Sequence, residues 1–157
     1  MICTRLGIGA ALAAGTLAAG LALAPGAAAV VPQTATIVAD CGLYGGGEAT
    51  LTATQSGTAA TVTVSSSEIT APLALAEDSI TSTLTLVKAG GGTTAFTGTE
   101  NPAMAAGDGV TVGPLTGTVA AGDSLEAFGG SLQMVLFGIT VTCTADGPQS
   151  PGPFVFE

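Results

Sequence analysis

The feature that most constrains this chain is an alternation of polar and apolar residues with a period of two. Two such runs, 49–54 and 61–65, lie on either side of the turn signal Ser56-Gly57. Successive side chains of a β-strand point to opposite faces, so these runs predict an antiparallel hairpin with one buried face. No helical period accompanies them. The sequence therefore predicts an all-β protein.

Further alternating runs predict further strands, which are separated by turns rich in Gly or Pro; they cover 36–39, 80–87, 94–97 and 110–119. Segment 68–79 is predicted to cross between sheets as a loop. Residues 131–145 are predicted to form a last strand system bent at Gly138, where the inward phase shifts as in a β-bulge. About seven short strands of this kind favour a β-sandwich, for which an immunoglobulin-like topology is an analogy, and a β-barrel is the alternative.

The N-terminal segment has the pattern of a secretory signal peptide. A short region with one positive charge, Arg5, precedes the uncharged and mildly apolar segment 6–24, and Pro25-Gly26 then interrupts it. Small residues follow, which predicts cleavage after Ala29 and Val30 as the new N-terminus. A transmembrane anchor is the alternative, but a segment so rich in Ala and Gly makes a weak span. The predicted organisation is a signal peptide over 1–29, a β-sandwich domain over 30–146 and a Pro/Gly-rich tail over 147–157.

Cysteine usage agrees with export. Removal of the signal peptide would take Cys3 away and leave Cys41 and Cys143. An even number of cysteines in an exported chain predicts a disulfide, here one that clamps the first strand to the last. The expected location is secreted or extracellular, with association to the cell wall as a further option.

Charge and residue types exclude several functions. The sequence holds 2 basic and 11 acidic residues and no His, and Lys88 is the only base after the signal peptide. Nucleic acids and anionic membranes need positive charge on the protein, so neither is expected as a partner. Without His, neither a Ser-His-Asp nor a Cys-His arrangement can form. We expect no enzyme activity, no cofactor and no metal site.

Two groups of carboxylates are candidate sites. The tetrapeptide Ala-Ala-Gly-Asp ends at Asp108 and again at Asp123. Turns in which the aspartate binds backbone amides are the expected role, and a shared Ca²⁺ is the alternative. Four glutamates could in principle supply a pair for glycoside hydrolysis. Sugar sites favour aromatic platforms, which are scarce here, so these acids are expected to be solvated surface charge; they are Glu48, Glu68, Glu77 and Glu126.

The Ala-rich leader ending APGAAA, the early Val-Ala-Asp-Cys41 and the closing Gly-Ile-Thr-Val-Thr-Cys143-Thr define a resemblance. The chain resembles small secreted, Cys-bracketed β-domain proteins of unknown function from high-GC Gram-positive (actinobacterial) species. That resemblance implies export and an all-β fold, and it implies no catalytic residue.

The functional expectation is a non-catalytic secreted or cell-envelope domain that binds an extracellular protein or a cell-wall polymer. One alternative is a secreted protease inhibitor that presents loop 99–109 or loop 147–152. The other is a carbohydrate-binding or carbohydrate-active module.

Overall fold

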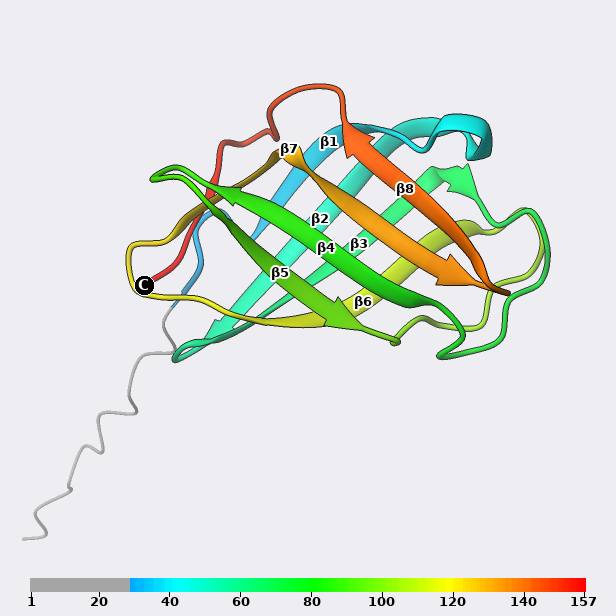
Figure 1. Cartoon of the computed structure of the whole chain (residues 1–157), viewed down its shortest axis with the longest axis horizontal. Helices are drawn as coiled ribbons and strands as arrows, with labels where there is room; N and C mark the ends of the chain where they lie inside the picture. Colours follow the sequence, from blue (N-terminus) through cyan, green and yellow to red (C-terminus); the bar gives the residue numbers. More distant parts are fainter. Residues whose placement is uncertain (1–28) are drawn as a thin grey trace, which may run out of the picture.

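A computed structural model describes residues 29–157 (Figure 1). The predicted signal peptide therefore lies outside the described residues except for Ala29, and the cleavage site between Ala29 and Val30 stays a prediction. Among residues 29–157, no helix is both long enough and apolar enough to cross a membrane.

Strands and one short 3₁₀ helix make up the described chain. In order they are β1 (Thr34–Asp40), η1 (Gly42–Tyr44), β2 (Gly46–Ser56), β3 (Ala59–Thr70), β4 (Thr81–Lys88), β5 (Thr93–Gly98), β6 (Gly109–Thr118), β7 (Ser124–Leu136), β8 (Ile139–Ala145) and β9 (Phe154–Val155). The hairpin predicted from the two alternating runs is β2 and β3, which pair from Thr50↔Ser65 to Ser56↔Ala59.

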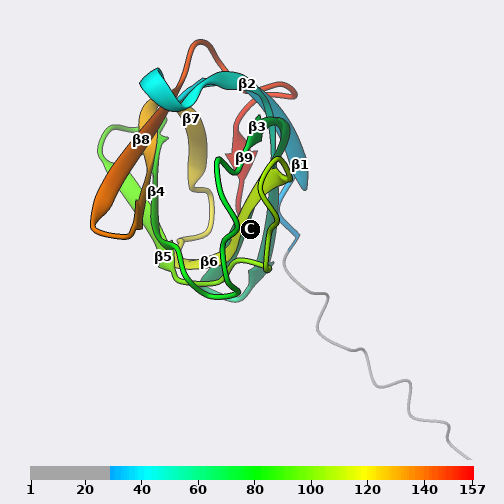
Figure 2. The same cartoon turned by 90° about the vertical axis from the view of Figure 1, so that its right-hand side faces the viewer.

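The sheet closes on itself, so the predicted β-sandwich is wrong. Eight antiparallel strands follow one another around a barrel in the order β1-β2-β3-β6-β5-β4-β7-β8. One closing contact is the pairing of β4 with β7, and the other is the pairing of β8 with β1. Figure 2 shows the resulting ring from one end. Alternation along a strand shows which side chains face inward, but it does not show whether the two edge strands of a sheet pair with each other and close it into a barrel.

The bend predicted at Gly138 is a hairpin turn. Leu136 pairs with Ile139, so only Phe137 and Gly138 connect β7 to β8. Both residues have positive φ, 50° and 76°, as a type I′ turn requires. A register irregularity in β7 lies elsewhere, opposite Thr85–Val87. A Cβ on Gly130 would overlap the Thr85 carbonyl oxygen, so the close approach there requires glycine.

One end of the barrel is closed by side chains and by the C-terminal segment. In segment 147–157, Ser150 bridges to Thr36, and β9 pairs with Ser124 and Leu125 at the start of β7. The segment thereby fills the wall between β7 and β1 at this end. The side chains that fill this end have almost no exposed surface; they are Val30, Leu86, Phe96, Leu115, Leu125, Phe154 and Phe156.

The predicted disulfide between Cys41 and Cys143 is present, and it spans 102 residues of sequence. It lies beside a short seam of the barrel, since β1 and β8 share only the pairs Ala39↔Ala145 and Asp40↔Thr144. A covalent bond at this place clamps two strands that few backbone hydrogen bonds hold. Such a bond suits an oxidising compartment.

Candidate functional site

Four connections surround the other end of the barrel (Figures 1 and 2). They are η1 after β1, segment 71–80 between β3 and β4, segment 99–108 between β5 and β6, and the turn 137–138. Segment 71–80 must pass across this end, because β6 and β5 separate β3 from β4 in the ring. We call this region the mouth of the barrel.

Backbone and side-chain hydrogen bonds hold segment 71–80 in place. The backbones of Leu75 and Met104 exchange two hydrogen bonds of 2.8 and 2.9 Å, which join this segment to segment 99–108. The buried Asn101 side chain accepts the N–H groups of Ser79 and Ile80, each at 2.9 Å. The mouth is therefore shaped by fixed backbone.

A pocket lies at the mouth, between segment 71–80 and the β7–β8 turn. It offers a volume of about 140 Å³ to the centre of a water-sized sphere. A cavity of roughly 150 Å³ lined by aliphatic side chains can hold a benzene ring, so this mouth pocket has room for a small apolar group. Its lining is overwhelmingly apolar and includes Tyr44, Ile69, Leu73, Leu75, Ile80, Leu136, Phe137, Ile139 and Val141.

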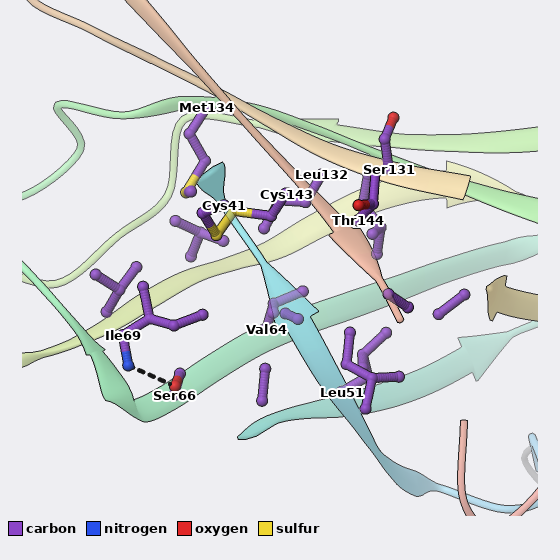
Figure 3. A pocket seen from close by; sticks show the side chains of 18 residues that line it. Cys41, Leu51, Val64, Ser66, Ile69, Ser131, Leu132, Met134, Cys143 and Thr144 are labelled. Carbon is purple, nitrogen blue, oxygen red and sulfur yellow. Dashed lines mark hydrogen bonds between the residues drawn. A yellow bond between two sulfur atoms is a disulfide. The ribbon is translucent and has the colours of Figure 1, made fainter. Parts of the chain in front are cut away.

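A smaller inner cavity lies next to the mouth pocket, inside the barrel. It offers about 50 Å³ on the same measure and shares Cys41, Ile69, Val110 and Met134 with the mouth pocket. Figure 3 shows its lining, in which carbon and sulfur predominate and side-chain oxygens belong to Ser66, Ser131 and Thr144. Ser66 already donates its hydroxyl to the Glu48 carbonyl oxygen at 2.6 Å. The two spaces are therefore neighbours, and both are lined by Cys41 of the disulfide.

Large apolar side chains are exposed around the mouth pocket. Of the ten exposed large apolar residues among 29–157, half gather here, and we call them the mouth patch: Leu43, Tyr44, Leu73, Phe137 and Ile139. Leu43 is fully exposed and Phe137 is 72% exposed. Exposed apolar side chains that occur singly need no explanation, whereas a group of them around a pocket marks a binding surface.

Phe137 occupies a position that a β-turn does not favour for it. In a type I′ turn both central residues have positive φ, which favours Asn-Gly and disfavours bulky residues. Among residues 29–157, Phe137 shares a positive φ with one other residue that is not glycine, Asp78, which also lies at the mouth. A residue that disturbs its own turn and lines a pocket points to a role outside folding.

The two repeated aspartates do not come together. Asp108 precedes β6 at the mouth and Asp123 follows β6 at the closed end. Each accepts a backbone N–H three residues earlier, Asp108 from Ala105 at 2.8 Å and Asp123 from Ala120 at 2.9 Å. Within 29–157, no group of three or more His, Cys, Asp or Glu side chains is placed to hold a metal ion.

Asp123 also forms an ion pair with Lys88, with 3.1 Å between Nζ and Oδ2. The hydrogen bond from the Ala120 N–H, together with Lys88, lowers the pKa of the Asp123 carboxyl below its usual value. This pair stabilises the closed end and is remote from the mouth.

Two of the four candidate glutamates accept backbone hydrogen bonds. Glu68 accepts the Glu48 N–H at 2.6 Å, and Glu126 accepts the N–H groups of Ala127 and Gln149 at 3.0 and 2.8 Å. Loop 99–109 lies at the mouth, whereas loop 147–152 lies along the barrel wall through the Ser150 bridge. The pocket could not be predicted from the sequence. Phe137-Gly138 between two alternating runs is also consistent with a hairpin that has a phenylalanine in its turn.

Comparisons of this chain with known protein families, with curated proteins and with solved structures found no match.

Proposed function

We propose that this chain is a non-catalytic, exported binding domain that takes up a small apolar ligand at the mouth of its barrel. The disulfide, the signal-peptide pattern and the resemblance to small secreted β-domains support export. The apolar mouth pocket supports binding, because barrel mouths with apolar linings are common ligand sites. Eight strands also give a barrel just wide enough for one small ligand.

The observation that carries the proposal is Phe137. It lines the mouth pocket, remains largely exposed and has a backbone conformation that favours asparagine over phenylalanine. The Phe137 ring can close over a ligand in the pocket, whereas a phenylalanine at this position does not stabilise the turn. Under the proposal, ligand contact is the reason for a phenylalanine at this position.

Changing Phe137 to asparagine is expected to separate binding from stability. The variant Phe137→Asn creates an Asn-Gly turn, so the free energy of unfolding should stay equal or rise by up to about 1 kcal/mol. It also removes roughly 50 Å² of apolar contact with a ligand, so affinity should fall about tenfold. The probe is N-phenyl-1-naphthylamine, an uncharged dye whose fluorescence rises in apolar surroundings, and its titration gives the dissociation constant.

Phe128 supplies the matched control, since it is also an exposed phenylalanine and lies on β7 outside the lining of the pocket. Phe128→Thr removes similar apolar surface from the barrel wall and should leave dye affinity unchanged. Equal affinity in the wild type and Phe137→Asn, or equal losses in both variants, would contradict the proposal.

A further inference from the structure

Negative charge is concentrated around the mouth. Of the eleven acidic residues in the chain, seven lie on the connections or strand ends at this end of the barrel. All seven are exposed; they are Asp40, Glu48, Glu68, Glu77, Asp78, Glu100 and Asp108. Lys88, the only base among residues 29–157, lies at the closed end in its ion pair with Asp123. The rim of the mouth therefore has no positive charge to balance its carboxylates.

A ligand that fills the mouth pocket must hold any charged group near this acidic rim. In water, a unit charge about 10 Å from one carboxylate changes affinity by about twofold, in a direction set by its sign. Several carboxylates act together on a group at the mouth. They weaken the binding of an anion and strengthen the binding of a cation.

The exposed aromatic rings of the mouth patch favour the same sign of charge. Tyr44 and Phe137 both line the mouth pocket and are both exposed. The faces of aromatic rings attract ammonium groups, and quaternary ammonium ligands are commonly held in this way. Aromatic faces and carboxylates thus surround one apolar pocket.

The same carboxylates disfavour three other occupants of the mouth pocket. A second copy of the chain docked mouth to mouth would bring two sets of seven carboxylates together. An anionic lipid surface would be repelled by them. A fatty acid would place its own carboxylate at the rim.

We propose that the ligand of the mouth pocket is a small cationic amphiphile, with an apolar chain or ring inside the pocket and an ammonium group among the rim carboxylates. This inference rests on the proposed function, because it names the chemical class of the ligand for the same pocket.

The test compares three compounds that share an octyl chain: octyltrimethylammonium, octanol and octyl sulfate. Each displaces N-phenyl-1-naphthylamine from the full protein at about 0.01 M salt, where screening is weak, and at about 1 M salt, where it is strong. At low salt, the ammonium should bind about tenfold more tightly than the sulfate, with octanol between them. At high salt, the difference should largely disappear.

Two variants locate the source of the preference. Glu77→Gln with Asp78→Asn removes two exposed carboxylates between Leu75 and Ile80, which both line the pocket. Asparagine tolerates the positive φ of 54° at residue 78. The ammonium should then bind about fourfold more weakly at low salt, while octanol is unaffected. Asp146→Asn with Glu157→Gln removes two exposed carboxylates away from the mouth and should change neither affinity.

The outcomes separate the two proposals. Octyl sulfate that binds as tightly as the ammonium at low salt would overturn the inference and leave the proposed function standing. An ammonium preference that survives in the Glu77/Asp78 variant at full strength would also overturn it. Failure of the dye and of all three octyl compounds to bind would overturn the proposed function and the inference together.

Discussion

Replacing Cys41 and Cys143 together by alanine is expected to lower the free energy of unfolding by about 4 kcal/mol. The bond joins residues 102 positions apart, and a loop of about that length restricts the unfolded chain strongly in the chain-entropy account. The folded state adds a second reason, because only two residue pairs hold β1 against β8 beside this bond. Both cysteines are buried, so alanine leaves no new polar group behind.

Unfolding in guanidinium chloride, followed by circular dichroism, measures this difference. Wild-type protein treated with a reductant serves as the control and should lose a similar amount of stability, because it loses the same covalent link. A loss below about 1 kcal/mol in the double variant would contradict the role of the disulfide as the clamp of this seam.

Phe96→Ala is expected to lower the free energy of unfolding by about 3–5 kcal/mol. Phe96 has no exposed surface and is among the largest side chains that fill the closed end. Its ring lies over Gly117, where an added Cβ would be 2.6 Å from Phe96 Cδ1. Removing the ring leaves a cavity that the surrounding strands of a closed barrel can fill only in part.

A double-mutant cycle tests the contact between Phe96 and Gly117. Gly117→Ala should be destabilising with Phe96 present and less destabilising in Phe96→Ala, since the ring has gone and the Ala95 carbonyl oxygen, 2.8 Å from the added Cβ, is the obstacle that remains. Additive effects would contradict the packing of the ring on Gly117. The exposed Phe128→Thr variant is the control for loss of an aromatic ring alone and should cost far less.

Local properties of the barrel were accessible from the sequence. The Thr-rich alternation of 49–54 and 61–65 gave the β2–β3 hairpin, because the side-chain period of a strand is a local property. Cysteine count and the signal-peptide pattern predicted the Cys41–Cys143 bond.

The closure of the barrel could not be predicted from the sequence in the same way. Closure depends on β4 meeting β7 and on β8 meeting β1, and these pairings join segments that are far apart in the chain. The sequence predicts a bulge at Gly138 and not a hairpin turn, because a two-residue turn with Phe at its first position departs from the Asn-Gly signal of such hairpins.

The candidate site was the least accessible part. No residue of the mouth pocket carries a motif. The four exposed residues that line it, Tyr44, Leu73, Phe137 and Ile139, come from three separate connections and a strand end. Their common place around one pocket follows only from the closed ring of strands. The sequence shows how many carboxylates the chain has, but only the topology of the barrel shows that most of them lie at one end.

Methyl-labelled NMR spectra recorded during a titration with N-phenyl-1-naphthylamine test the central claim most directly. The account predicts that methyl signals of Leu73, Leu75, Ile80, Leu136 and Ile139 at the mouth shift with the dye, whereas those of Leu86, Leu115 and Leu125 at the closed end stay in place. Shifts confined to the closed end or to the outer wall, or no shifts at any dye concentration, would contradict an apolar binding site at the mouth of this barrel.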